Sequence, residues 1–503
     1  MRALGAGLLL MWTGFVHAQE ASVPYTPSLL ARHHLQLLAD QAGMKLPVTH
    51  WPQPLAAVEQ ALDSIPEPEA WSASRQAVLR EVRALHDKPE LSLNLRGRAE
   101  GLTGFDEQYT PGSSLAFKTD EGRWDLGELS TALKLGVRVE QNSNSLLAQP
   151  SGWGLDGARQ VRPDDTAAVL GLWGWNVQAF AHRNWWGPGW QSSLVNGHNT
   201  TPWMGVGLQR GSSAPSSSKW LHWMGPWSLD VFVAKAQDPI VTTGQASGYL
   251  FSGMRLTLKP TDWLEVGLSR GLQTGGAGRP GGLSNFVKAF FGQNTNKWEW
   301  SPYEDSSNQL AGYDVRVRCP KSLGACAVYG QMMGEDSAGE YPPLPYRFMH
   351  LVGFEQVLGQ GRHRVFVEYA DTHVPQLFNS SAMEPGYVNA HYRQGYTNGA
   401  RWIGSAQGGA SRVTTLGWLD AELHMLVKVH YGTVGMSLGS YDPEANAPHG
   451  KLKGLTAQKT FEWRDWRVTP ELSVMRLSDG GDTGANKRNN TRLGVEVAMP
   501  LSF

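Results

Sequence analysis

The last stretch of the sequence alternates strictly between large apolar side chains and polar or small ones. Its large apolar members occupy the odd positions Leu493, Val495, Val497, Met499, Leu501 and Phe503. A repeat of two places all of them on one face of an extended strand. In a soluble sheet that face meets a protein core, whereas in an outer-membrane barrel it meets lipid and the polar face lines the lumen.

The same alternation recurs from Leu91 onward. The clearest stretches are 91–100, 126–140, 228–236, 252–260, 262–271, 311–319, 346–355, 361–371, 424–432 and 466–477. Most have roughly 9 to 12 residues, the length that a tilted strand needs to cross a bilayer. A soluble sandwich would alternate too, but no second core pattern accompanies these strands. We therefore expect residues 91–503 to form a closed antiparallel β-barrel of roughly 16 to 20 strands.

The N-terminus reads as an export signal. Arg2 precedes an apolar run from Ala3 to Val16, and Val16 and Ala18 place small residues before a cleavage point. A membrane anchor is the alternative, but the run is shorter than the roughly 20 residues that a spanning helix needs. We expect residues 1–18 to be a signal peptide that is removed on export.

Residues 19–90 follow a different, helical repeat. Ser28 can cap a helix that ends near Gly43, a second helix follows the W-P-Q-P motif, and a third is expected over Pro68–Asp87. Such a small unit has few apolar positions for independent stability, so it should pack against something larger. Polar stretches between the strands are expected to form external loops: 107–122, 141–165, 273–308 and 374–411.

The two cysteines, Cys319 and Cys326, flank a short Pro- and Gly-containing turn between two strand-like runs. In an oxidising compartment this spacing favours a local disulfide. The net charge of −1 offers no long-range attraction to nucleic acid.

Charged residues gather at the polar positions of the expected strands. They include Arg96, Arg98, Arg138, Arg255, Arg316, Arg318, Arg364 and Arg492, with Glu100, Glu128, Glu140, Asp314, Glu368 and Glu496. They could form a salt-bridged lumen that keeps the barrel filled and stiff, or a guanidinium surface for acidic sugars. The first interpretation is the simpler one for any single residue.

No pattern of catalytic residues stands out. The sequence has no G-x-S-x-G, H-E-x-x-H or P-loop motif. His33 and His34 would point about 100° apart on a helix and would not share a metal ion, and Asp164 and Asp165 are expected in a solvated loop. We expect neither an enzyme nor a metal site, and no cofactor.

The segment from Arg183 to Trp203 holds four Trp residues beside two Pro and three Gly. Pro188, Gly187 and Gly189 would let the chain fold tightly there. Aromatic faces suit the C–H faces of sugar rings, and amides can bond to hydroxyls. The candidate ligand residues are therefore Arg183, Trp185, Trp186, Trp190, Asn196 and Asn199. The alternative is a structural turn with aromatic side chains at the membrane interface.

Several stretches resemble the Wzi family of outer-membrane capsule-assembly proteins. They are 125–134, 183–196, 328–336, 366–372 and 392–404, together with L-L-A-D-Q-A-G and W-P-Q-P near the N-terminus. The resemblance implies a barrel of eighteen strands with a small helical bundle, residues 19–90, at its periplasmic end. It also implies lectin-like attachment of capsular polysaccharide to the cell surface without catalysis, and it adds Tyr392, Arg393 and Arg401 to the candidate ligand residues.

The sequence thus predicts a monomeric barrel in the outer membrane of a Gram-negative bacterium. Its expected partners are a capsular or other surface polysaccharide, outer-membrane lipid and the barrel insertion machinery, which the terminal Phe503 would engage, as in the bacterial proteins that the C-terminus resembles. A porin or solute channel is the alternative function, and it would require an open lumen.

Overall fold

A computed structural model describes most of the chain. The described residues are 21–97, 101–108, 112–126, 129–141, 154–156, 159–237, 248–292, 307–337, 345–376, 379–389, 392–399, 401–435, 450–479 and 487–501. The expected signal peptide, residues 1–18, and the terminal Phe503 lie outside them.

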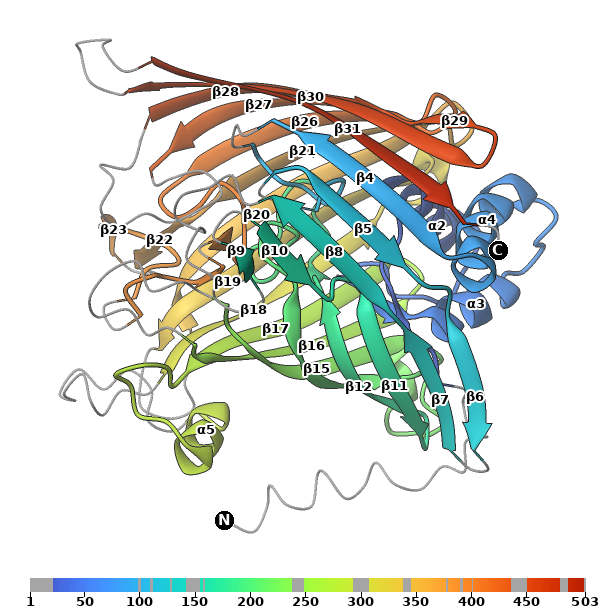
Figure 1. Cartoon of the computed structure of the whole chain (residues 1–503), viewed down its shortest axis with the longest axis horizontal. Coiled ribbons are helices and arrows are strands. Elements are labelled where there is room, and N and C mark those ends of the chain that lie inside the picture. The colour runs from blue at the N-terminus through green and yellow to red at the C-terminus, as the bar shows by residue number, and fades with distance from the viewer. Residues whose placement is uncertain are drawn as a thin grey trace.

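One antiparallel sheet dominates the molecule and closes on itself (Figure 1). Its strands up to the midpoint of the chain are β4 (Glu90–Arg96), β5 (Ser114–Lys118), β6 (Gly122–Leu126), β7 (Leu129–Lys134), β8 (Gly136–Gln141), β9 (Gly154–Asp156), β10 (Arg159–Arg162), β11 (Thr166–Leu172), β12 (Trp175–His182), β14 (Trp203–Arg210), β15 (Trp227–Lys235) and β16 (Leu250–Thr261). The rest are β17 (Leu264–Thr274), β18 (Ser307–Arg318), β19 (Cys326–Ser337), β20 (Pro345–Leu358), β21 (His363–Asp371), β22 (His373–Gln376), β23 (Asn379–Pro385), β26 (Arg412–Asp420), β27 (Met425–Val434), β28 (Gly450–Lys459), β29 (Phe461–Trp463), β30 (Trp466–Asp479) and β31 (Lys487–Pro500).

The first and last strands of this sheet pair with each other. Leu93 on β4 lies opposite Val497 on β31, in an antiparallel register that runs from Arg96↔Gly494 to Glu90↔Pro500. This pairing closes the ring of strands, which leaves no open sheet edge between the two ends of the chain.

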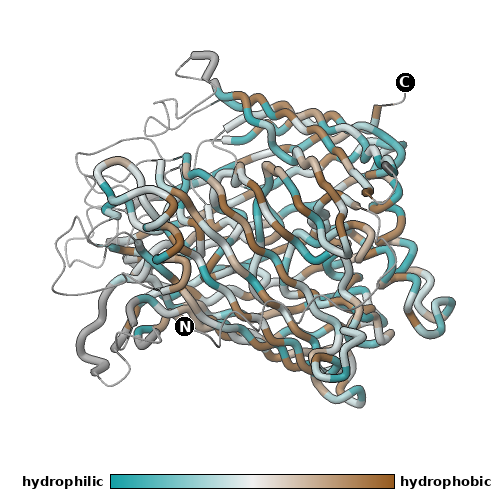
Figure 2. The backbone as a smooth tube through the Cα atoms, turned by 90° about the horizontal axis from the view of Figure 1, so that it is seen from below, coloured by the Kyte–Doolittle hydropathy of each residue, from teal (hydrophilic) through white to brown (hydrophobic). Residues whose placement is uncertain are grey.

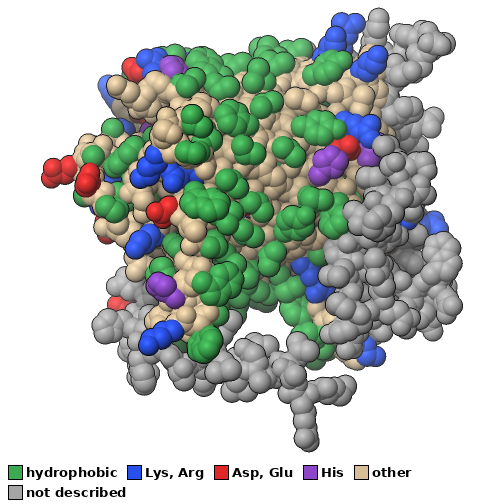
Figure 3. Space-filling view, turned by 180° about the vertical axis from the view of Figure 1, so that it is seen from behind, with side chains coloured by type: hydrophobic (Ala, Val, Ile, Leu, Met, Phe, Trp, Pro, Cys, Tyr) green, Lys and Arg blue, Asp and Glu red, His purple; other side chains and the backbone are tan. Residues whose placement is uncertain are grey.

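The expected alternation of faces is present along the wall (Figure 2). On β31, Arg492 is buried inside the barrel, whereas Leu493 is 66% exposed on the outside. The space-filling view shows a broad apolar field over the middle of the outer wall, with charged side chains gathered toward its two ends (Figure 3). An apolar band with polar margins is the outer surface that a membrane barrel presents to lipid.

Three helices lie at one end of the barrel: α2 (Leu29–Gln41), α3 (Leu55–Asp63) and α4 (Ser72–Asp87) (Figure 1). Ser28 caps α2 as expected, because its hydroxyl accepts a hydrogen bond from the Ala31 amide at 3.1 Å. The third helix begins at Ser72 rather than Pro68. Helix α2 is buried on nearly every side, since it packs against the interior of the barrel. No helix in the described part of the chain is long and apolar enough to cross a membrane.

Cys319 and Cys326 form a disulfide with Cα atoms 5.3 Å apart, in the turn between β18 and β19. Ala325 in this turn packs against Leu37 of α2. The disulfide-bonded turn therefore lies at the helical end of the barrel and forms part of the surface that receives the helices.

Two of the expected external loops are wrong. Residues 107–122 include strand β5, and residues 374–411 include β22, β23 and a segment that is buried inside the barrel. These stretches are rich in Gly, Ser and Asn and lack a long alternating pattern. Such a composition does not require exposure to solvent, because hydrogen bonds can satisfy polar groups in the interior. The described parts of 141–165 and 273–308 add β9, β10 and the short helix α5 (Leu283–Phe290).

The Asp164 side chain also departs from the expected solvated loop. It is buried and accepts a hydrogen bond from Nε of Arg138 at 2.9 Å. The partner lies 26 residues away, on β8, so local sequence gives no sign of it.

Candidate functional site

Two segments turn inward from the wall and fill the interior beside β15–β21. The first, residues 183–202, connects β12 to β14; the second, residues 386–411, precedes β26. We call their described residues the luminal plug. The first segment contacts inward-facing side chains of several strands, including Gln331 on β19 and Glu368 on β21.

Glu368 binds the backbone of the plug at the turn of residues 190–192. Its carboxylate accepts backbone hydrogen bonds from Trp190 at 2.8 Å and Ser192 at 2.6 Å, and a weaker one from Gln191 at 3.3 Å. Gly189 is required at this turn, because a Cβ there would lie 2.2 Å from the carbonyl oxygen of Ser192. The glycines of W-W-G-P-G-W thus let the backbone wrap around one buried carboxylate.

The tryptophans of this segment are packed among charged groups. The indole nitrogen of Trp190 donates to Glu355 at 2.6 Å. The guanidinium groups of Arg32 and Arg364 lie 4.3 and 4.8 Å from its ring centroid. Cations over an indole face are attracted by the ring quadrupole, and more strongly when desolvated. The protein's own cations and the Glu355 carboxylate therefore contact this indole.

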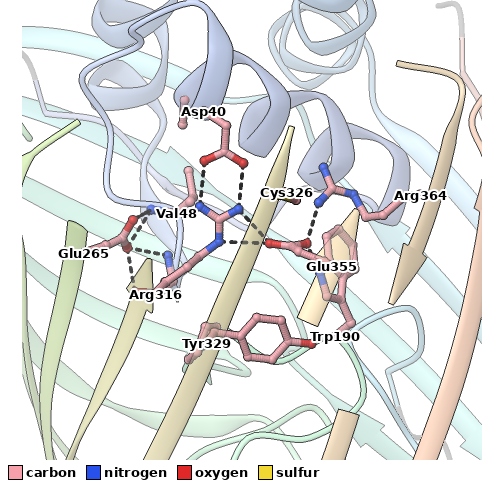
Figure 4. Close-up of polar contacts among 12 residues, drawn as sticks. Asp40, Val48, Trp190, Glu265, Arg316, Cys326, Tyr329, Glu355 and Arg364 are labelled. Carbon is pink, nitrogen blue, oxygen red and sulfur yellow. Dashed lines mark hydrogen bonds and ion pairs between the residues drawn. The ribbon is translucent and has the colours of Figure 1, made fainter. Parts of the chain in front are cut away.

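The helical end of the plug is held by a buried ionic network (Figure 4). Arg316 donates two hydrogen bonds of 2.7 Å to Asp40 of α2, and two of 2.6 and 2.9 Å to one oxygen of Glu355 on β20. Arg364 donates to the other oxygen of Glu355 and to Nδ1 of His33. These contacts bind α2 to the inner wall through charge pairs that would be costly to break singly.

Backbone contacts continue this connection between α2 and the plug. Arg32 donates to the carbonyl oxygens of Pro188 at 3.0 Å and Gly189 at 2.8 Å. The short strand β13 (Trp185–Trp186) pairs with β2 (His50–Trp51) in the N-terminal region. The helices and the first plug segment are therefore one packed body.

The second segment joins the first on the side away from the helices. The Gly197 amide donates to the carbonyl of Ile403 at 2.8 Å. Arg401 donates to the side-chain oxygen of Asn199 at 2.7 Å, and Asn199 donates to the carbonyl of Trp402 at 3.0 Å. Tyr387 and the short hairpin of β24 (Thr397–Asn398) and β25 (Arg401–Trp402) complete this layer. Two motifs that lie about 200 residues apart in the sequence thus meet inside the barrel.

The structure brings most of the candidate ligand residues together but buries them. Those buried are Arg183, Trp185, Trp186, Trp190, Asn196, Asn199, Tyr392 and Arg401. Arg393 is exposed. The tryptophans of the plug are not at the membrane interface, so that alternative is wrong for them, because the segment folds into the lumen. A role of these residues in ligand binding stays a prediction.

Charged pairs line the inner wall, as the simpler interpretation of the strand charges expects. Arg255 bonds to Asp314 at 2.7 Å, and Arg492 bonds to Glu107 at 2.9 Å. Glu355 and Asp40 were not singled out from the sequence. Glu355 occupies a polar position of a recognised strand and could have been found. Asp40 lies in the L-L-A-D-Q-A-G stretch that carries part of the family resemblance, but nothing local indicates its partner, which lies 276 residues away.

Among the described residues, no group of three or more His, Cys, Asp or Glu side chains is placed to hold a metal ion. Burial, with the nearby Arg183 guanidinium, lowers the pKa of His198 in the plug to about 3. A neutral, buried imidazole suits packing.

Comparison with known proteins gives the same fold. The family described as capsule assembly protein Wzi matches residues 97–489. A protein encoded in the cps region of Klebsiella pneumoniae is 28% identical over 355 residues, which cover 68% of this chain and 64% of that relative's length. Wzi from Escherichia coli, described as an outer membrane protein involved in group 1 capsule assembly and a carbohydrate-binding β-barrel, has a TM-score of 0.75 at 22% identity. That match covers 96% of this chain and 100% of the other.

Proposed function

This chain belongs to the capsule assembly protein Wzi family, and from that premise we propose that it holds exported capsular polysaccharide at the surface of a Gram-negative cell. It does so as an outer-membrane barrel and catalyses no reaction. The likeness to Wzi from Escherichia coli, an outer membrane protein and carbohydrate-binding β-barrel, supports this proposal.

We propose that residues 1–18 are a signal peptide, 19–90 a periplasmic helical bundle and 91–503 an eighteen-stranded transmembrane barrel. The ring of strands supports the number. Of its twenty-five described segments, β6, β8 and β11 continue β5, β7 and β10 along the same line, and β9, β22, β23 and β29 are short extensions. Eighteen crossings remain. With an even number of strands, the first strand begins and the last strand ends on the same side of the membrane.

The observation that carries this proposal is the filled interior. The plug and α2 link β15, β19, β20 and β21 through buried contacts. A diffusion channel needs a water-filled lumen, whereas an attachment protein needs a rigid platform at its external end. The plug therefore favours attachment over the porin alternative.

We place the polysaccharide contact where the plug reaches the end of the barrel opposite the helices. Arg393 is exposed there, and the guanidinium of Arg279 lies 5.6 Å from the ring centroid of Tyr392. Guanidinium groups bind carboxylates in a two-point geometry, and the buried Tyr392 ring packs against the guanidinium of Arg279. The buried candidate residues would support this surface from below.

A deletion strain tests the proposal. Without the protein, polymer synthesis should continue while the polymer appears in the medium instead of on the cell. Complementation with Arg279→Ala/Arg393→Ala should leave most polymer released, whereas Arg464→Ala, an exposed arginine at the helical end, should restore attachment as wild type does. Loss of polymer synthesis in the deletion strain would overturn the assignment.

Conductance across planar bilayers separates the porin alternative. Purified protein should pass little current, because the plug occupies the lumen. Steady open-channel current in wild-type protein would favour a channel.

A further inference from the structure

The outer face of β27, β28 and β30 changes character along its length. Cross-strand register defines successive rows of outward-facing residues. From the middle of the wall toward the end opposite the helices, the rows are Val427/Ala457/Leu472, Val429/Leu455/Val474, Tyr431/Lys453/Arg476 and Thr433/Lys451/Ser478. Two apolar rows are thus followed by two rows that hold three cations and hydroxyl groups.

The three cations, Lys451, Lys453 and Arg476, are exposed. Lys453 lies directly opposite Arg476 in the antiparallel register, and like charges in that position repel each other. Among the described residues, none of the three forms an ion pair. Asp371, three strands away from the two lysines, is already bonded to Arg412. Within the part of the chain that the structure describes, the three cations thus form a compact positive surface with no carboxylate paired to it.

The position of this surface indicates what could balance it. Its neighbour Tyr431 is 59% exposed, and the Lys453 ammonium lies 6.0 Å from its ring centroid. Exposed tyrosines next to an apolar band are typical of the depth where lipid head groups begin. The charged margin visible beyond the apolar field in Figure 3 agrees with a boundary of this kind.

We propose that Lys451, Lys453 and Arg476 bind the phosphate groups of a phosphorylated glycolipid in the outer leaflet. The inference rests on the proposed function only for the orientation of the barrel, with the helices in the periplasm. Arg476 offers a planar pair of donors to phosphate oxygens, and the two ammonium groups add point charges. The acyl chains of the same lipid would lie against Leu455 and Val474 in the row below.

Retention of bisphosphorylated lipid A on the purified, detergent-solubilised full chain tests this site. Native mass spectrometry should show wild-type protein carrying the lipid, and dephosphorylated lipid A should bind far more weakly. Lys451→Gln/Lys453→Gln/Arg476→Gln should weaken binding roughly a hundredfold, because each removed cation costs about a factor of five near an anionic surface. Lys321→Gln/Lys459→Gln/Arg464→Gln, which removes three cations at the helical end, is the matched control and should bind as wild type does.

Several outcomes would overturn the site. One is equal lipid binding by the two triple variants. Another is equal binding of bisphosphorylated and dephosphorylated lipid A by the wild-type protein, a measurement that does not depend on the folding of any variant. Binding of acidic polysaccharide instead of lipid A at these three residues would also overturn it. The assay is independent of capsule attachment: a triple variant that keeps its polymer but loses lipid A supports the site, and a deletion strain without a capsule defect would reject the proposed function alone.

Discussion

The tryptophans of this protein occupy two opposite environments. One group, Trp51, Trp185, Trp186, Trp190, Trp203 and Trp402, is fully buried in the plug and its contacts. A second group lies exposed in or beside the turns at the helical end: Trp124, Trp173, Trp220, Trp223, Trp263, Trp463 and Trp466. The exposed group matches the aromatic girdle of a membrane barrel. The buried group stiffens the interior through cation–π contacts and buried hydrogen bonds.

The difference shows that the indole group alone does not determine whether a tryptophan is buried or exposed. The residues that surround it in the folded protein do. Trp190 is surrounded by Arg32, Arg364 and Glu355, which its ring and its N–H satisfy together. Trp220 is 88% exposed, in a turn at the end of the wall. Substitutions in the two groups should therefore differ most in their effect on stability.

The largest contrast is expected between Trp190→Ala and Trp220→Ala. The first leaves a cavity and removes one of the two hydrogen bonds that this Glu355 oxygen accepts, and it should lower the free energy of unfolding by about 3–5 kcal/mol. The second should change it by less than about 0.5 kcal/mol. Urea unfolding in lipid vesicles, followed by circular dichroism, measures both. Equal effects would mean that the plug does not contribute to the stability of the barrel.

The next largest effect concerns the carboxylate beneath the plug turn. Glu368→Gln replaces an acceptor of charge-assisted bonds from Trp190 and Ser192 with a neutral amide, and it should cost roughly 1.5–3 kcal/mol. Hydrogen exchange of the amides at 190–192 should accelerate. Glu422→Gln is the control, since Glu422 is 68% exposed in its pair with Arg362 and should cost almost nothing. Unchanged protection at 190–192 would argue against a stabilising role for the backbone hydrogen bonds to Glu368.

The plug and the helical end should also respond to pH in opposite directions. The plug should lose stability in acid. Burial lowers the pKa of His198 and of His50 to about 3. Below the unfolded pKa of about 6.5 the unfolded chain binds protons that the folded chain refuses, so stability is lost as the pH falls from 6.5 toward 3. The protection factors of the amides at 195–199 should fall as the pH is lowered from about 7 to about 4.5, and His198→Gln should reduce this fall.

At the helical end the sign reverses. Hydrogen bonds from His86 to Glu121 and Glu59 raise the pKa of that imidazole to about 9. Its contribution to holding α4 is complete below the unfolded pKa of about 6.5 and is lost as the pH rises through 9. The protection factors of the α4 amides should fall above neutral pH in the wild type, whereas those of His86→Gln should change little over the same range. Loosening of α4 in acid instead would contradict the assignment.

The smallest effect is one of position rather than stability. Trp220→Cys, labelled with an environment-sensitive dye, should fold normally and be quenched more by lipids with a quencher at the head group than at mid-chain. Arg393→Cys, at the other end, should be quenched by neither lipid. Labelling is selective because Cys319 and Cys326 are joined in a disulfide. Equal quenching at both sites would remove Trp220 from the proposed girdle.

The wall and the first helix could be predicted closely. The alternation of Arg492 and Leu493 survives as an inward and an outward residue, and Ser28 caps its helix. The interior could not be predicted. Residues 183–202 have the composition of a turn or a binding loop, and nothing local reveals that Glu368 receives their backbone. Likewise, the polar 374–411 stretch was expected outside, although much of it is buried.

By itself the sequence determined which faces of the strands meet apolar and polar surroundings, because a repeat of two is a local property of neighbouring residues. Only the tertiary structure decided whether a connection turns out toward water or in toward the lumen. That choice depends on partners far along the chain: the Leu194 amide meets a side chain 137 residues away, and the Trp190 amide one 178 residues away. A buried polar backbone is stable only where such partners converge, and convergence is a property of the closed barrel.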